Sequence, residues 1–135
     1  MKTAGCGSYG APRTLLMTAN SVGGVFTYAT GICQSLIPHE IRVILVTMGA
    51  PLSPWQRRQI QKLENVSLIE TEYRLEWKPD TWKDVDAAGE RLLYIESEGA
   101  VEAVYLNGYV HASLPWRTRP VVVGHSCVLS WWEAV

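Results

Sequence analysis

The stretch RTLLMTANSVGGVFT, residues 13–27, decides the fold of this chain. Its apolar run at 14–18 is short enough for a strand buried on both faces, and the polar and glycine residues 20–24 interrupt it before an apolar-periodic segment begins. The order is therefore strand, glycine loop, helix. Gly23 and Gly24 allow a positive φ and the close approach of a ligand, and the N–H groups that open a helix suit a phosphate or another anion. Such a pair also serves a plain strand-to-helix connection, and both interpretations stay open.

The glycine loop lacks the two common nucleotide-binding signatures. The spacing GxGxxG is absent, and no Gly-Lys-Ser/Thr follows as in a P-loop. Where a dinucleotide-binding protein carries an acid for the ribose, after the second strand, this chain has Met48 and Gly49. A dinucleotide-dependent oxidoreductase is therefore the least favoured function for such a fold.

Length and composition indicate one globular domain in 135 residues, of which 47% are hydrophobic and 19% charged. The formal net charge of -1 and the scattered basic residues argue against nucleic acid as a partner. No run reaches the roughly 20 apolar residues of a membrane helix, and residues 1–12 lack the apolar core of a signal peptide. We expect 1–12 to be a flexible tail before a domain at 13–135. Cys6, Cys33 and Cys127 show no metal or disulfide spacing, which favours small core residues in a cytoplasmic protein.

The pattern downstream alternates helices and strands. It predicts a helix at 25–37 ended by Pro38, a strand at 41–47, a helix at 55–63 capped by Ser53, a strand at 66–71, a helix at 82–98 capped by Asp80 or Thr81, and strands at 103–106 and 120–124. This order predicts an α/β fold, namely an open, mostly parallel, doubly wound sheet of about five strands with helices on both faces.

Ligands of such sheets bind beyond the carboxyl ends of the strands. Arg74 in the loop after the third strand suits an anion, and Trp77 or Tyr109 suits stacking on a sugar. His125, after the fifth strand, suits a hydrogen bond to a hydroxyl or acid–base work. The alternative for each of them is a purely structural role, in which the side chain only contacts neighbouring residues.

These residues do not complete a catalytic mechanism. Ser126 beside His125 makes no triad, because adjacent side chains diverge, and no GxSxG elbow is present. The three histidines show no metal-binding spacing. The residues alone therefore predict a doubly wound domain with a loop suited to anions and leave the reaction open.

Five longer sequence segments indicate a more specific function. They are NSVGGVFTYA, VTMGAPLSP, YRLEWKPDTWKDV, VYLNGYVHASLPW and VVVGHSCVLSWWEAV. Together, over residues 13–135, they resemble the N-terminal domain of bacterial family-4-like glycosyltransferases. These are retaining enzymes with two facing Rossmann-like domains, the GT-B architecture.

The resemblance implies transfer of a sugar from a nucleotide-sugar donor to an acceptor with retention, with no cofactor and no metal. Gly23 and Gly24 would face the donor diphosphate, and His125 would lie near the transferred sugar. Many relatives carry a histidine where this chain has Asn107, which makes Asn107 a second candidate for a catalytic role. The loop argument adds four acceptor-side residues, namely Arg74, Trp77, Tyr109 and His111.

The family's second, donor-binding domain is missing from this chain. We therefore expect the chain to be inactive alone, and to be either complemented by a separate donor-binding half or a truncated fragment. Apolar residues near the end of the sequence, Val128, Leu129, Trp131 and Trp132, would then form a patch suited to a missing segment. A non-catalytic module that holds a nucleotide or an anion at the glycine loop is the alternative function.

Overall fold

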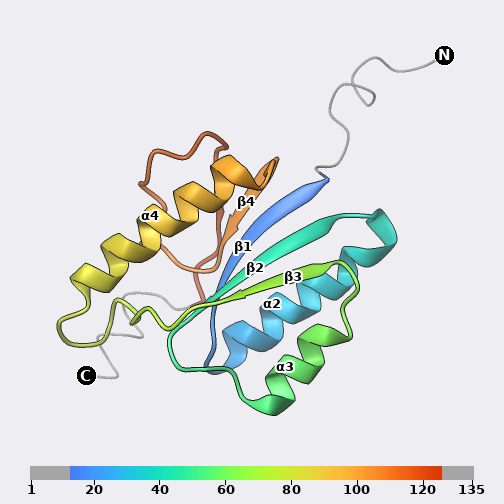
Figure 1. Cartoon of the computed structure of the whole chain (residues 1–135), viewed down its shortest axis with the longest axis horizontal. Helices are drawn as coiled ribbons and strands as arrows, with labels where there is room; N and C mark the ends of the chain where they lie inside the picture. Colours follow the sequence, from blue (N-terminus) through green and yellow to red (C-terminus); the bar gives the residue numbers. More distant parts are fainter. Residues whose placement is uncertain (1–12, 126–135) are drawn as a thin grey trace.

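One parallel sheet organises the protein, and a computed structural model describes residues 13–125 of it (Figure 1). Within that range the strands are β1 (Thr14–Asn20), β2 (Arg42–Met48), β3 (Val66–Glu70), β4 (Ala103–Leu106) and β5 (Val121–Val122). Their spatial order is β3-β2-β1-β4-β5. The chain thus builds outward from β1 in one direction and then crosses to its other side, so the topological switch point lies between β1 and β4.

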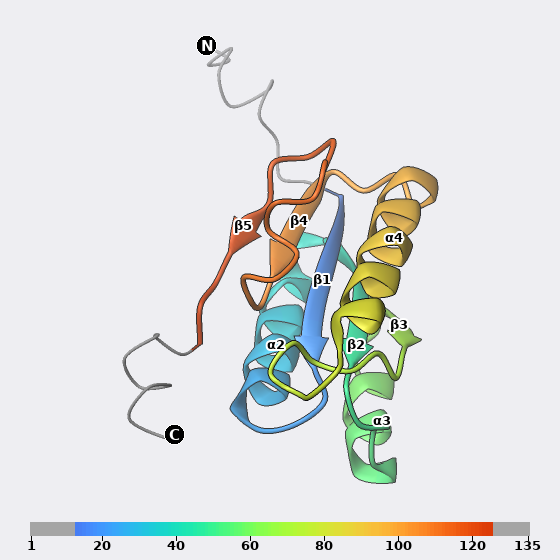
Figure 2. The same ribbon diagram turned by 90° about the vertical axis from the view of Figure 1, so that its left-hand side faces the viewer.

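Helices cover both faces of this sheet, and the predicted fold class is confirmed. Helices α2 (Gly24–Ser35) and α3 (Pro54–Gln61) lie on one face, and α4 (Trp82–Glu98) lies on the other (Figures 1 and 2). Successive residues of β1 serve the two faces, because Met17 packs in the core beside α2 and α3 while Leu16 packs in the core beside α4. Both side chains are fully buried. The unbroken apolar run of β1 therefore reflects burial on both faces.

The free thiol of Cys33 is a core group, as the sequence predicted. It lies buried on α2, and its Sγ atom is 4.0 Å from the Sδ atom of Met17. Burial raises the pKa of the thiol to about 11. Cys6, Cys127, the tail at 1–12 and the apolar residues from Val128 to Trp132 lie outside the described residues.

Asn20 and Met48, which were predicted to lie in loops, belong to strands β1 and β2. The parallel ladder between β1 and β2 runs from the pair Thr14 and Arg42 to the pair Asn20 and Met48. The predicted ends at 18 and 47 were therefore too early. The ladder continues because hydrogen bonds between parallel backbones do not depend on an apolar side chain, and Ser21 extends it by donating its N–H to Met48 O at 2.9 Å.

The predicted end of the first helix at 37 was wrong. Helix α2 stops at Ser35, and residues Ile37–His39 form a short 3₁₀ turn that contains Pro38. Proline disfavours α-helical conformation at the residue before it, so the α-helix ends ahead of Pro38 rather than at it. Glu40 then takes a left-handed φ of 56°, and β2 begins after it at 42 instead of 41.

Other boundaries differ by one or two residues. Helix α3 spans 54–61 rather than 55–63, and β3 ends at 70 rather than 71. The strand predicted at 120–124 is only Val121–Val122, because β5 pairs with no more than the last two residues of β4. Helix α4 and strand β4 have the predicted bounds. Thr81, one of the two residues predicted for the cap, is the N-cap residue of α4, but its side chain makes no capping hydrogen bond.

The segment after β4 is anchored on α4 by a buried carboxylate. Glu96 is 1% exposed, and its two oxygens accept the backbone N–H groups of Arg117 and Thr118, each at 3.0 Å. The guanidinium of Arg117 also donates to the backbone oxygen of Glu96 at 3.2 Å. These bonds satisfy a charge that burial would otherwise make costly, and they fix the path of the chain towards β5.

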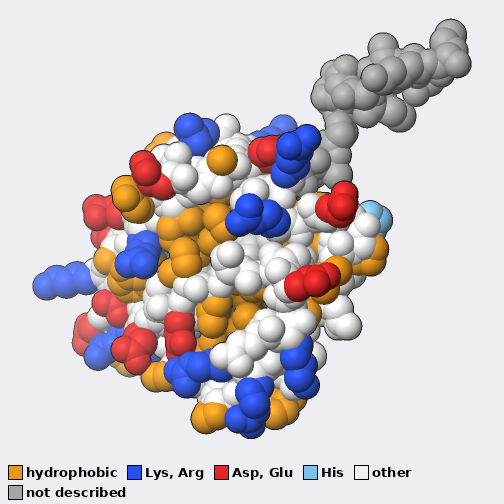
Figure 3. All heavy atoms as spheres, turned by 45° about the vertical axis from the view of Figure 1, so that its right-hand side comes forward, with side chains coloured by type: hydrophobic (Ala, Val, Ile, Leu, Met, Phe, Trp, Pro, Cys, Tyr) orange, Lys and Arg blue, Asp and Glu red, His pale blue; other side chains and the backbone are white. Residues whose placement is uncertain are grey.

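The surface shows no segregation of charge on the face seen in Figure 3. Hydrophobic side chains gather in its middle, and Lys, Arg, Asp and Glu side chains are interspersed around them.

Candidate functional site

The glycine loop forms an open turn at the N-terminus of α2. Gly23 is the N-cap residue with φ 78° and ψ -159°, a conformation that is essentially restricted to glycine. No heavy atom of the described residues lies within 4 Å of where a Cβ of Gly23 or Gly24 would stand. Within the same range no side chain caps the helix. The first N–H groups of α2 therefore face space that an anion can enter.

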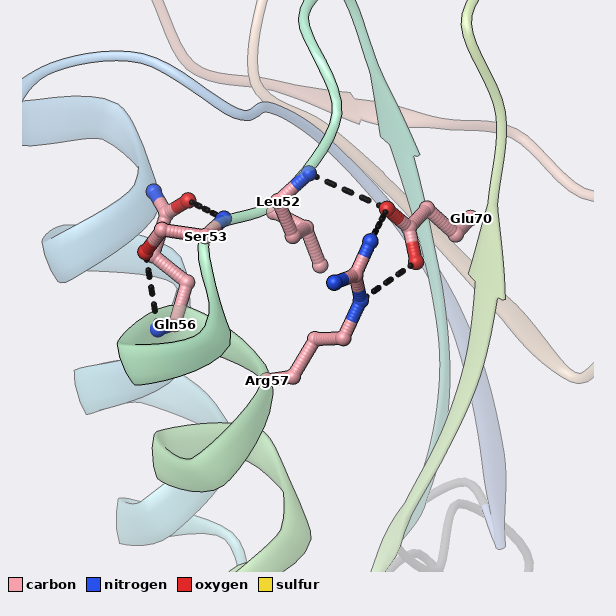
Figure 4. A network of polar contacts seen from close by, with 5 residues as sticks. All are labelled: Leu52, Ser53, Gln56, Arg57 and Glu70. Atoms are coloured by element: carbon pink, nitrogen blue, oxygen red, sulfur yellow. Dashed lines mark hydrogen bonds and ion pairs between the residues drawn. The ribbon is translucent and has the colours of Figure 1, made fainter.

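Backbone and side-chain bonds hold this turn from both neighbouring elements. Ser21 donates its N–H to the end of β2, and its carbonyl oxygen accepts from the Nε2 atom of Gln56 at 2.6 Å. Gln56 is fixed in turn by a capping box, since Ser53 N donates to its Oε1 at 2.8 Å and Ser53 Oγ accepts its N–H at 3.1 Å (Figure 4). The predicted cap at Ser53 is thus confirmed. Its link to the glycine turn through Gln56 was missed.

Glu70 at the end of β3 holds α3 through an ion pair with Arg57 and holds the loop before α3 through a hydrogen bond from Leu52 (Figure 4). Arg57 donates to Glu70 through Nε at 3.2 Å and Nη2 at 2.8 Å, and Leu52 N donates to the same carboxylate at 3.0 Å. The hydrogen bond from Arg57 is the largest cause that holds the pKa of Glu70 below its usual range, and the bond from Leu52 is the next largest. Both side chains are well exposed, so the pair contributes little to stability by itself.

His125 and Asn107, the two candidate catalytic residues, lie in contact beyond β4 and β5. The Nε2 atom of His125 is 2.8 Å from Oδ1 of Asn107. Asn107 is anchored on β1, because its N–H donates to Oγ1 of Thr18 at 3.2 Å and its Nδ2 donates to the backbone oxygen of Thr18 at 2.8 Å. Asn107 therefore bridges the switch point between β1 and β4, and it is also hydrogen-bonded to His125.

Two tyrosines connect His125 to α2. The ring of Tyr28 meets the ring of His125 edge to face, with centroids 4.7 Å apart. The hydroxyl of Tyr28 lies 2.6 Å from that of Tyr105 on β4. Burial is the main cause that raises the pKa of Tyr105 to about 12, and this hydrogen bond is the second cause. Because Tyr28 follows Gly24 by about one turn of α2, the ring contact places His125 beside the first two turns of the helix. Neither tyrosine was singled out from the sequence.

Two adjoining hollows lie along this edge of the sheet. The larger, of about 600 Å³, extends from Val22 and Gly49 to the loop after β3, and Arg74 and Trp77 line it. The smaller, of about 40 Å³, lies between the ends of β1 and β4 and reaches His111. Leu75 and Trp77 line both hollows. Three of the four acceptor-side candidates, Arg74, Trp77 and His111, therefore border one stretch of the carboxyl edge.

The remaining candidate, Tyr109, lies elsewhere. Its side chain is 64% exposed, and its hydroxyl occupies the place where a Cβ of Gly124 would stand. Neither hollow is lined by it. His111 also has a structural bond, because it is 7% exposed and its Nε2 lies 2.9 Å from the backbone oxygen of Val85 on α4. Its imidazole thus supports the wall of the small hollow.

Asn20, which lines the smaller hollow, has a buried side-chain oxygen that lacks a partner among the described residues. This atom is Oδ1, and Asn20 is the last residue of β1. A buried acceptor normally has a donor, so a water or a ligand hydroxyl fits this position. Asn20 was placed in the glycine loop by the sequence, and only its strand position explains why it points to the switch point.

Neither a scan of protein-family models nor a search of curated proteins gave a match for this chain. Among the helices within residues 13–125, none combines the length and the apolar character needed to cross a membrane. In the same range no three His, Cys, Asp or Glu side chains gather as metal ligands would.

Proposed function

We propose that this chain is the acceptor-side part of a retaining glycosyltransferase that uses a nucleotide-sugar donor, and that it acts together with a separate donor-binding half. One observation carries the proposal. The glycine turn is open, and His125 touches Tyr28, which lies one helical turn after Gly24 on α2. An anion at the turn would therefore lie near a histidine that can hydrogen-bond the sugar attached to it.

The roles follow from the chemistry of each group. The N–H groups at Gly23 and Gly24 would hold the donor diphosphate, whose charge builds up as the sugar leaves. His125 would hydrogen-bond the transferred sugar, and Asn107 would support it. Arg74 and Trp77 would receive the acceptor in the larger hollow, where charged and aromatic groups lie together. No cofactor or metal has a role in this scheme, and the proposed location is the cytoplasm.

A non-catalytic module that binds a nucleotide or another anion is the second candidate. The open turn favours it, because that feature needs no second domain to accept a phosphate. The two functions differ in the affinity expected of this chain alone. A single face of a cleft buries little of a nucleotide, so the transferase half should bind with a roughly millimolar dissociation constant.

Titration of the 135-residue chain separates these functions. Uridine, guanosine and adenosine diphosphates and inorganic pyrophosphate are added while backbone amide signals are followed by NMR. We expect weak, saturable shifts at Ser21 to Val25 that vanish in Gly23→Val. The matched control Gly31→Val keeps them, because Gly31 lies farther along α2 with open space around it. Submicromolar binding would favour the module, and no shift with any of the four probes would refute both functions.

Sugar transfer is tested after the chain is joined to a donor-binding domain of this enzyme class. Release of nucleoside diphosphate that depends on an acceptor is the expected result. Full activity after Gly23→Val and His125→Ala together would refute the assigned roles, because these changes remove both groups that face the donor.

A further inference from the structure

The orientation of the Asn107 side chain is fixed by what it contacts. A backbone carbonyl only accepts hydrogen bonds, so the amide atom that lies 2.8 Å from the oxygen of Thr18 must be the NH₂ group. The amide oxygen is consequently the atom that faces His125. The backbone N–H of Asn107 binds the hydroxyl of the same threonine, which holds the residue at two points.

This orientation decides which nitrogen of His125 carries the proton. An amide oxygen has no hydrogen to give, so the Nε2 atom that lies 2.8 Å away must be the donor. In a neutral imidazole the other nitrogen is then an acceptor. No described residue is hydrogen-bonded to that second nitrogen, Nδ1, and the side chain is exposed.

The other contact of the ring leaves this assignment unchanged. Tyr28 meets His125 edge to face rather than by a hydrogen bond, and its hydroxyl is engaged by Tyr105. Tyr28 touches the imidazole through its own ring, and within residues 13–125 no carboxylate forms an ion pair with His125. The ring is therefore located by Tyr28 and given its proton arrangement by Asn107.

We propose that Asn107 is a positioning residue that locks His125 with its proton on Nε2 and presents Nδ1 as a hydrogen-bond acceptor to a ligand hydroxyl. In the transferase this hydroxyl would belong to the donor sugar or the acceptor, a role that rests on the proposed function. The tautomer itself does not rest on it. Asn107 thereby acts through His125, and it makes no contact with the reacting atoms.

Long-range ¹H–¹⁵N correlation of the full chain with labelled histidine tests the tautomer at a pH where the rings are neutral. The chain supplies its own references, because it has three histidines. His111 also faces a backbone carbonyl through Nε2 and must carry its proton there. His39 has no side-chain hydrogen bond within residues 13–125 and should exchange between both forms. We expect His125 to resemble His111.

Two variants complete the test. Asn107→Ala removes the acceptor, and the spectrum of His125 should move towards that of His39. Tyr28→Phe keeps the ring contact and all atoms of Asn107, so it should leave the tautomer as it is. A wild-type His125 that populates both forms overturns the proposal whether or not the variant folds. A single Nε2–H form that survives Asn107→Ala, with the signals of His111 unchanged, also overturns it. Neither result alters the diphosphate titration, so failure of the two proposals is distinguishable.

Discussion

Replacement of single glycines around the start of α2 should separate backbone strain from side-chain packing. Gly23 and Gly24 are adjacent, and a Cβ at either meets no atom within 4 Å among the described residues. They differ in conformation, because Gly23 alone of the pair has a positive φ. We therefore expect Gly23→Ala to destabilise the protein and Gly24→Ala to stabilise it, although neither side chain is crowded.

The magnitudes follow from the backbone. An alanine at φ 78° and ψ -159° is strained by about 1–3 kcal/mol, and a less flexible unfolded chain offsets about 0.4–1 kcal/mol of this. The net loss for Gly23→Ala should be about 1–2 kcal/mol. Gly24→Ala places a better helix former in the first turn and should gain about 0.5 kcal/mol. A gap of about 2 kcal/mol corresponds to a difference in Tm of roughly 8 °C for a domain of this size.

Urea denaturation followed by circular dichroism measures both changes, and Gly31→Ala in the interior of α2 is the control for the gain from helix propensity. We expect Gly31→Ala and Gly24→Ala to shift the midpoint upwards and Gly23→Ala to shift it downwards with an unchanged slope. Equal effects at positions 23 and 24 would refute the reasoning, because the positive φ of Gly23 would then impose nothing on its side chain.

Three further predictions concern charged and titrating groups. Glu96→Gln places an amide NH₂ against one of two backbone donors and should cost about 1–3 kcal/mol in urea denaturation; an unchanged midpoint would contradict the anchoring role. Tyr28→Phe should lower the pKa of Tyr105 part of the way from about 12, since burial, the larger cause, remains. Tyrosinate absorbance checks this, and in the wild type stability should fall as pH rises through about 10 to 12. The pKa of Glu70 is lowered by folding, so its contribution is present above its unfolded pKa and lost as pH falls through the folded pKa. Glu70→Gln should therefore weaken the acid dependence of Tm, and Arg57→Gln should do the same; a steeper dependence in either variant would count against the pair.

The fold was predictable because its signals are local. The buried strands are continuous apolar runs. The apolar periodicity of residues 82–98 predicts a helix, and α4 begins and ends at those residues. Boundaries were less predictable, since the last residues of β1 and β2 owe their conformation to ladder bonds rather than to their own side chains. The end of α2 is a different case, because Pro38 disfavours α-helical conformation at the residue before it, and this local rule favours an end earlier than residue 37.

The candidate site was only partly predictable. The positions of His125 and Asn107 followed from the rule that parallel strands end at one edge, but their mutual contact is set by Thr18, 89 residues before Asn107. Glu96 was missed because a charged residue on a helix is usually exposed, and only the later backbone N–H groups explain its burial. The loop position of Tyr109 predicted a place on the acceptor side, and no sequence signal indicates its position against Gly124.

The central place of β1 affects how the protein emerges from the ribosome. Its first neighbour, β2, follows after one helix, whereas its second neighbour, β4, is translated only after β2, α3, β3 and α4. At about 5–20 residues per second, the 89 residues between Thr18 and Asn107 take roughly 4 to 18 seconds to be made. Until then one edge of β1 exposes unpaired N–H and C=O groups beside an apolar face. Such an edge can pair with a strand of another chain. Nascent chains halted before β4 should therefore be the ones that chaperones bind and that aggregate.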